Sequence, residues 1–272
     1  MKRADLHIHT TASDGGFTVR QVFQEAEKLG LSAIAITDHD SVEALPAAAD
    51  ISAGGIVELV PGIELSVALE YGELHLLGYY LDYTDPELLE SLARFQKVRS
   101  RRADRILKKM EEMGYPLDME ELLPGQMTGS IGRLHIAQGL VRAGYVRTIP
   151  EAFRRLLGDG GPAYVSKIKL SLKDAMDMIL RVGGVPVLAH PGQLDRDELI
   201  PELVKIGLAG LEAYYPSHSR FAINHYEELA RHYGLIATGG SDCHGTNKDR
   251  ILMGTVTVPC KVVEELKAKA KE

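Results

Sequence analysis

The segment Asp5-Leu6-His7-Ile8-His9 indicates the architecture to expect for this chain. It lies in a predicted strand over residues 3–9, and strand side chains alternate between the two faces of a sheet. Asp5, His7 and His9 should therefore point to one face, with Leu6 and Ile8 facing the opposite packing layer. Two imidazoles near the carboxyl end of a strand can act as a pair of metal ligands. The alternative is a pair of buried, hydrogen-bonded structural histidines.

Four further predicted strands end in residues with ligand chemistry. The motifs are Asp38-His39-Asp40, Pro61-Gly62-Ile63-Glu64, His190-Pro191-Gly192 and Ser241-Asp242-Cys243-His244. Barrel enzymes build their sites from the carboxyl ends of several strands. Five such endings in chain order therefore favour a barrel over an open doubly wound sheet, which strand–helix alternation also permits. His75, inside an apolar strand, adds one more imidazole, or else it is a buried structural histidine.

The middle of the chain differs from both ends. Residues 1–84 and 165–272 alternate predicted strands and helices, and we expect them to form the barrel domain. Residues 85–164 are strand-poor and include a long charged helix from Pro86 to Met113, so we expect a helical insertion or cap. A barrel of this kind needs roughly 250 residues, which a chain of 272 residues accommodates.

Composition narrows the classes of partner. The net charge of −7 argues against a generally basic surface, so we expect no stable binding to duplex DNA. The two cysteines, Cys243 and Cys260, form no paired motif, which is typical of a reducing compartment. The first residues carry no apolar signal core, and no apolar run approaches the ~20 residues needed to span a bilayer. We therefore expect a cytoplasmic protein with no membrane partner, and a monomer.

In this order, the motifs DLHIHT, TDHD, PGIE, AHPG and GSDCH resemble those of the polymerase-and-histidinol-phosphatase (PHP) superfamily. The resemblance covers nearly the whole chain. Within the helical segment, residues 132–137 (GRLHIA) and 162–166 (PAYVS) resemble the YciV/TrpH-like branch. That branch includes nucleoside 3′,5′-bisphosphate phosphatases and 5′-to-3′ exoribonucleases that act on short RNA. The resemblance implies a distorted (β/α)7 TIM-like barrel with a small inserted helical subdomain.

The resemblance also implies two or three divalent metal ions, with Mn²⁺ expected and Fe or Zn²⁺ as alternatives. Nine residues match the ligand positions of the family: His7, His9, Asp14, His39, Glu64, His75, His190, Asp242 and His244. Glu64 would bridge the first and second metals. Asp14 stands where some members have histidine, and its oxygen ligand should favour harder ions such as Mn²⁺. Asp5, Asp38 and Asp40 are expected to support the ligands or the fold.

Hydrolysis of a phosphate ester explains why such a ligand set is useful. A metal-bound water has its pKa lowered toward ~7, and two metals ~3.5–4 Å apart can hold the resulting hydroxide together with a phosphoryl oxygen. We therefore expect a metal-dependent phosphoesterase that uses a metal-bridging hydroxide. Its substrate would be a terminal phosphate ester of a nucleotide or a short RNA.

Substrate-binding candidates come from two regions. Arg99, Arg102, Arg133 and His135 lie in the helical segment, where arginine suits bidentate contact with phosphate. The alternative for the arginine-rich stretch of the long helix is a solvated charged surface. Resemblance to the family favours phosphate binding, most strongly for Arg133, although Gly132 stands where relatives often have serine.

The second region is Ser217-His218, which opens a predicted helix whose amino terminus would favour an anion. His218 is a candidate for phosphate binding or for protonation of the leaving group, or it is only a neighbour of the N-cap. Arg133 and His218 are thus the predicted catalytic side chains.

Two other functions fit the same residues. The first is a PHP phosphatase that acts on a different small phosphomonoester, such as histidinol phosphate or a sugar phosphate. The second is a non-catalytic, metal-stabilised nucleotide-binding module. Metal content measured beside phosphoester turnover separates an enzyme from such a module.

Overall fold

The computed structural model describes residues 2–69, 72–118, 122, 132–165, 170–248 and 250–271, without the side chains at 96 and 98–100. The chain divides into two compact units, which are Met1–Glu90 with Lys169–Glu272, and Ser91–Ile168. The barrel and insertion boundaries expected at residues 84/85 and 164/165 stay a prediction.

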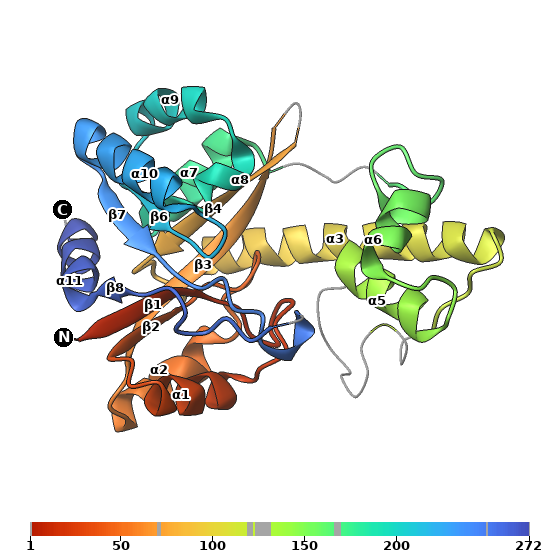
Figure 1. Ribbon diagram of the computed structural model, residues 1–272, viewed down its shortest axis with the longest axis horizontal. Helices are drawn as coiled ribbons and strands as arrows, with labels where there is room; N and C mark the ends of the chain where they lie inside the picture. The colour runs from red at the N-terminus through yellow and green to blue at the C-terminus, as the bar shows by residue number, and fades with distance from the viewer. Residues whose placement is uncertain are drawn as a thin grey trace. The chain divides into compact units, whose positions relative to one another are not determined.

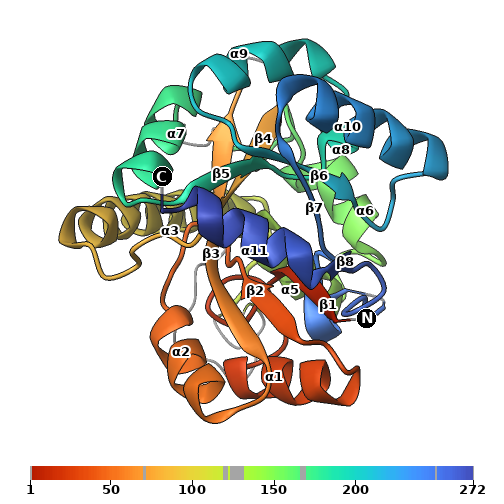
Figure 2. The same ribbon diagram turned by 90° about the vertical axis from the view of Figure 1, so that its left-hand side faces the viewer.

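The first unit is built on one sheet with the strand order β7-β6-β5-β4-β3-β2-β1-β8, which curls into a nearly closed barrel (Figure 2). The strands are β1 (Arg3–Ile8), β2 (Ala33–Ile36), β3 (Glu58–Ala68), β4 (Glu73–Tyr79), β5 (Val185–Leu188), β6 (Gly210–Tyr214), β7 (Ile236–Gly239) and β8 (Val258–Pro259). The expected α/β barrel is confirmed, and the two-residue β8 adds to the seven predicted strands.

The direction of the strands differs from the parallel sheet that strand–helix alternation predicts. Strands β1, β2 and β3 are mutually parallel, as are β5, β6 and β7, but β4 is antiparallel to both β3 and β5. The cause is the short connection between β3 and β4, because parallel neighbours need a long crossover. His75 lies near the start of β4, so reversal of this strand places it opposite Ser66, beside the carboxyl end of β3.

The barrel closes between β1 and the segment that follows β7. The amide of His9 donates to the carbonyl of Cys243 at 2.9 Å, and the amide of Cys243 donates to the carbonyl of His7 at 3.3 Å. Gly240 permits this approach, because a Cβ there would lie 2.4 Å from the backbone nitrogen of His7. Closure therefore brings the motif after β7 alongside the histidines of β1.

The amino end of the barrel is filled by the C-terminal helix α11 (Cys260–Lys269), which crosses it in Figure 2. Its buried Val263 and Leu266 belong to a core cluster with Leu6, Tyr79 and Val187. The hydroxyl of Tyr79 donates to the carbonyl of Leu6 at 2.7 Å, which satisfies the one polar atom of that large side chain. With its amino end packed, the barrel holds polar groups at the carboxyl end.

Helices cover the outside of the sheet in the first unit (Figure 1). They are α1 (Val19–Lys28), α2 (Leu45–Gly54), α7 (Leu172–Arg181), α9 (Ile200–Lys205) and α10 (Arg220–Tyr233). Shorter turns lie in the connections after β5 and β7, namely α8 (Pro191–Leu194), η2 (Asp197–Leu199) and η3 (Gly245–Asn247). Local chemistry sets the ends of these helices: Thr18 and Gln21 form a capping box on α1, and Gly234 ends α10 with a φ of 67°.

Across the described residues, no helix combines the length and apolarity that a bilayer crossing requires.

The second unit is helical in its described residues. It contains most of α3 (Pro86–Glu112), together with α5 (Arg133–Arg142), α6 (Ile149–Ala152) and the π-helical turn η1 (Phe153–Leu157). Its own core includes Ile106, Met110, Ile136, Leu140 and Leu157. Residues 149–157 therefore form an α turn followed directly by a π turn.

The closure of the barrel gives a first test. Gly240→Ala would push its Cβ into the backbone of His7, so the free energy of unfolding should fall by about 1–3 kcal/mol, as for overpacking. The matched control is Gly54→Ala, because a Cβ at Gly54 meets nothing within 4 Å. Thermal unfolding should show a lower Tm for Gly240→Ala alone. Equal Tm values for the two variants would show that the close approach at His7 is not a constraint.

Candidate metal centre

The structure brings the nine predicted metal ligands into one connected cluster at the carboxyl end of the barrel. Each lies within 4.0 Å of at least one other: His7, His9, Asp14, His39, Glu64, His75, His190, Asp242 and His244. They come from β1, β3 and β4 and from the loops that follow β1, β2, β5 and β7. Residues separated by more than 230 positions in the chain therefore share one site.

Glu64 is the centre of this cluster and is only 1% exposed. Its Oε2 lies 3.3 Å from Nε2 of His7, 3.2 Å from Nε2 of His9 and 3.2 Å from Nδ1 of His39. These three rings come from β1 and from the loops that follow the neighbouring strands β1 and β2. One carboxylate oxygen therefore faces three imidazoles.

The other oxygen of Glu64 serves the opposite side of the site. Its Oε1 lies 2.8 Å from Nδ1 of His75 and 3.1 Å from Nε2 of His190. His190 has a φ of 30°, in the left-handed region that few non-glycine residues adopt. Backbone strain of this kind is retained where the surrounding structure enforces it, often at functional sites.

Two aspartates complete the cluster. Oδ1 of Asp242 lies 3.1 Å from Nε2 of His9, and Oδ1 of Asp14 lies 3.4 Å from Nε2 of His244. Three groups in the described chain have ligand atoms close enough together to hold an ion: His9, Asp14, His39 and His244; His7, His9 and Asp242; and His39, Glu64 and His75. The clusters are thus able to bind metal.

The ligand atoms themselves fit divalent cations. Ring nitrogens of His7, His9, His39 and His75 and Oε2 of Glu64 are buried, and none of these atoms has a hydrogen-bond partner among the described residues. Several of these nitrogens lie close to Glu64, but their contacts lack hydrogen-bond geometry. A buried polar atom without a partner costs about 1–3 kcal/mol, so a cation that accepts these lone pairs would remove the deficit. Imidazole and carboxylate together suit Mn²⁺, Fe and Zn²⁺.

Electrostatics favours positive charge at this point. Burial raises the pKa of Glu64, but His39, His75 and His7 outweigh it and hold that pKa well below its ordinary range. Burial lowers the pKa of His9, but the carboxylates of Asp242 and Glu64 outweigh it and raise the pKa to about 9. A metal must displace such protons before it binds, so protons and metals compete for the site.

Glu212 was missed by the sequence analysis. It lies in β6, is 0% exposed, and its Oε1 lies 2.9 Å from Nδ1 of His7. Its Oε2 accepts a hydrogen bond from the backbone amide of His190 at 2.8 Å. One carboxylate thus orients two predicted ligands. The one signal in the sequence was a charged residue inside an apolar strand. Glu212 does not stand at a strand end, where ligand chemistry was expected.

The aspartates expected to support the ligands have structural partners. Asp5 accepts from the amides of Ser241 at 2.8 Å and Gly254 at 2.9 Å, which secures the loop after β7. Asp38 accepts from the amide of Thr10 at 2.7 Å, and Asp40 accepts from the amide of Ser66 at 2.8 Å. These bonds fix backbone segments near the cluster.

His218 is held by the backbone. Its Nδ1 lies 2.8 Å from the carbonyl of Ala213, and its Nε2 accepts from the amide of Gly192 at 3.2 Å. Both ring nitrogens are therefore engaged, and a proton-transfer role would require one bond to break. Ser217 beside it is exposed. Tyr215, which was not predicted, instead donates to Oδ2 of Asp242 at 2.9 Å.

The predicted substrate residues of the second unit make contacts within that unit. Arg133 pairs with Asp159 at 2.9 Å, and its guanidinium lies 5.9 Å from the ring centre of Phe153. His135 accepts from the amide of Gly132 at 3.1 Å and thereby caps α5. Arg102 donates to the carbonyl of Val165 at 2.8 Å. The side chain of Arg99 lies outside the described residues.

Known proteins resemble this chain along nearly its whole length. The family model for the PHP domain matches residues 5–156. A phosphoribosyl 1,2-cyclic phosphate 1,2-diphosphodiesterase of Eggerthella lenta is 35% identical, over 89% of this chain and 94% of its own length. The 5′-3′ exoribonuclease Rnm of Escherichia coli is 33% identical, over 88% and 84% respectively. A 3′,5′-nucleoside bisphosphate phosphatase of Chromobacterium violaceum is 32% identical, over 90% and 88%.

A solved structure also resembles this chain along its length. A protein from Bifidobacterium adolescentis, assigned as a metal-dependent phosphoesterase, superposes with a TM-score of 0.88 at 29% identity, over 98% of this chain and 96% of its own. The barrel, the histidine–carboxylate cluster and these relatives define a metal-dependent phosphoesterase. The chain belongs to the PHP domain family, so the predicted family is confirmed.

The position of Glu212 gives a second prediction. In Glu212→Gln the amide can accept only one of the two N–H bonds, and its NH₂ group must then face another donor. Affinity for Mn²⁺ should fall ~10–100-fold, as for other changes that loosen the support of a ligand. Competition with a chelator measures it, and Glu228→Gln, at an exposed position of α10, is the control. Unchanged affinity would show that Glu212 does not position His7 or His190.

Proposed function

We propose that this phosphoesterase hydrolyses a terminal phosphate ester of a nucleotide or a short RNA, with two or three divalent metals, Mn²⁺ foremost, held by the nine clustered residues. The main support is Glu64, whose two oxygens face imidazoles on opposite sides of the site. Bound metals would supply an activated water and neutralise phosphate charge. The relatives named above for a cyclic phosphate, for RNA and for nucleoside bisphosphates all concern ribose phosphates.

The protein residues around the cluster would hold its parts in place. Glu212 fixes the ring of His7 and the backbone of His190. Asp242 is fixed in turn by the hydroxyl of Tyr215 and by Nζ of Lys248, which lies 3.2 Å from its Oδ2. Supporting contacts of this kind orient the ligands before the substrate arrives, so little reorganisation accompanies the reaction.

Arg133 remains our candidate for binding the substrate phosphate. Its guanidinium lies within 6 Å of the ring centres of Phe153 and Tyr164, which limits its motion, and its side chain is 26% exposed. A guanidinium whose motion is already limited loses less freedom when its planar group forms a bidentate phosphate contact. The substrate phosphate would replace Asp159 as the ionic partner of Arg133.

The test of function uses Mn²⁺-loaded protein and four substrates: adenosine 3′,5′-bisphosphate, a 5′-phosphorylated oligoribonucleotide, histidinol phosphate and a sugar phosphate. The proposal expects turnover of one or both of the first two. Turnover of only histidinol phosphate or the sugar phosphate would assign the enzyme to another substrate class. A metal-replete protein inert to all four would instead support a non-catalytic binding module.

Glu64→Gln tests the central carboxylate in the same assay. Replacement of one charged oxygen by an amide removes a ligand shared by both sides of the site, so turnover should fall to background while the far-ultraviolet spectrum stays native. Glu58→Gln, at an exposed position of the same strand, is the control. Substantial turnover by a metal-loaded Glu64→Gln protein would contradict the bridging role.

Arg133→Ala tests the substrate side. Loss of a charge-assisted contact should raise KM for the nucleotide substrate ~10–100-fold, with metal content unchanged. Arg147→Ala removes an exposed arginine from the same unit and should behave as the wild type. A loss of metal, or a loss of folded structure, in Arg133→Ala would assign this residue a structural role instead.

A further inference from the structure

A cavity of about 380 Å³ opens directly beside the metal centre, within the first unit. Its lining residues are Glu73, Leu74, His75, Ala189, His190, Gln193 and Leu194. His75 and His190 are the two imidazoles that face Oε1 of Glu64. A group in this cavity would therefore lie next to a phosphate bound at the centre. Its volume is at the lower end of the roughly 300–1,000 Å³ typical of small-molecule sites.

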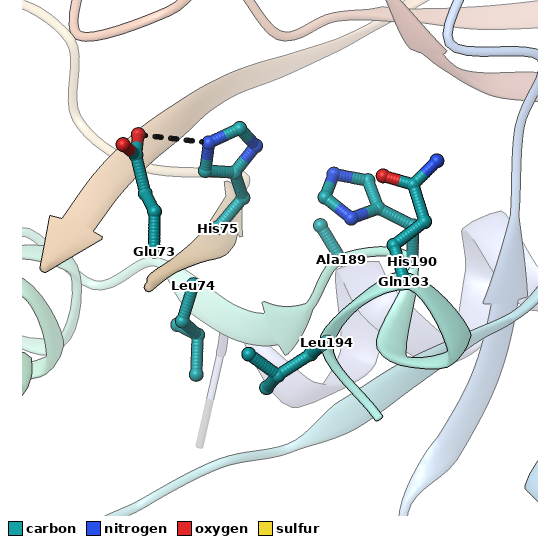
Figure 3. A pocket seen from close by; sticks show the side chains of 7 residues that line it. All are labelled: Glu73, Leu74, His75, Ala189, His190, Gln193 and Leu194. Carbon is teal, nitrogen blue, oxygen red and sulfur yellow. Dashed lines mark hydrogen bonds and ion pairs between the residues drawn. The ribbon is translucent and has the colours of Figure 1, made fainter. Parts of the chain in front are cut away.

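The cavity wall is divided by chemistry. In Figure 3, Glu73, His75, His190 and Gln193 lie along one side, and Leu74 and Leu194 lie opposite. The apolar side suits the carbon skeleton of a sugar or the face of a base. The polar side offers oxygens for hydroxyl groups. Such a mixture of apolar surface and a few placed polar groups is typical of sites for small organic molecules.

Glu73 defines what the cavity accepts. Its Oε1 lies 3.1 Å from Nε2 of His75, and its side chain is 31% exposed. This resembles the contact of Glu212 with His7, but Glu212 is fully buried, whereas Glu73 is accessible from the cavity. An ionised carboxylate accepts strong hydrogen bonds from hydroxyl groups and repels a second phosphate.

Gln193 adds a second polar group on the same wall. Its Nε2 donates to the hydroxyl of Tyr215 at 2.9 Å, which in turn donates to Asp242. This bond fixes the amide and leaves its carbonyl oxygen as an acceptor. The cavity therefore presents acceptors to its occupant, which matches the hydroxyl donors of a sugar.

We propose that this cavity is a ribose subsite, which holds the uncharged sugar of the substrate beside the phosphate that is cleaved, with a sugar hydroxyl donating to Glu73. The inference rests on the proposed function and extends it. It makes the enzyme selective for esters on a ribose with a free neighbouring hydroxyl, because that hydroxyl is what separates RNA from DNA at a protein site. It also places any second phosphate of the substrate outside the cavity.

Filling the cavity tests the subsite. Leu194→Trp should raise KM for adenosine 3′,5′-bisphosphate at least tenfold and abolish the binding of adenosine, which carries no phosphate, to the Mn²⁺-loaded protein. Leu180→Trp adds the same bulk at an exposed position of α7 and is the control. Elemental analysis and Tm should match the wild type in both variants. Unchanged KM and adenosine binding in Leu194→Trp would overturn the subsite.

A second comparison tests the hydroxyl contact. The wild type should bind adenosine ~10-fold or more tightly than 2′-deoxyadenosine, as expected for a hydrogen bond to a charged group. Glu73→Ala should bring this ratio toward one, and equal affinities in the wild type would overturn the role of Glu73. Adenosine binding without turnover of any nucleotide would support the subsite and reject the proposed function. Nucleotide turnover that Leu194→Trp leaves unchanged would support the proposed function and reject the subsite.

Discussion

A carboxylate deep inside a protein needs positive charge around it, and the carboxyl end of this barrel is organised by that need. The Born cost of moving one isolated carboxylate into an apolar interior is on the order of 20 kcal/mol. Glu64 is 1% exposed, and five imidazoles lie within 3.3 Å of its oxygens. Those rings offset the cost either by carrying protons or by sharing cations with the carboxylate. The low pKa of Glu64 and the high pKa of His9 express the same mutual dependence.

The fold supplies this arrangement by keeping its two ends different. At the amino end, Val263 and Leu266 of α11 pack against the apolar interior. At the carboxyl end, the strands deliver charged groups instead, and the reversed β4 contributes His75 from near its start. Barrel closure at Cys243 then adds Asp242 and His244. The polar groups are thereby concentrated where solvent and substrate can enter, as is usual for barrel enzymes.

Two carboxylates support the cluster from different environments. Glu212 is sealed from solvent and contacts only protein groups, so it orients His7 and His190 whatever occupies the site. Glu73 contacts His75 from the wall of a cavity, where an occupant can reach it. The same pairing of carboxylate and imidazole can therefore stabilise the centre at Glu212 and contact the substrate at Glu73.

Much of the fold was predictable from the sequence, because the spacing of apolar residues and the motifs at strand ends depend on short stretches of chain. The motif at His7 and His9 and the four later strand ends predicted an α/β barrel of the PHP family, and both are confirmed. The reversed direction of β4 followed from its short connection to β3, which the overall alternation of strands and helices obscured.

Residue identities and strand-end patterns showed in advance which side chains carry ligand chemistry and where they stand along the chain. Which atoms face one another depends on the folded barrel, because the distances between Glu64, His75 and His190 follow from barrel curvature and strand direction. The folded barrel also decides that Glu212, unremarkable within its strand, touches two of the clustered residues. The cavity beside His75 likewise exists only where β4, the loop after β5 and α8 meet, since no single segment contains its walls.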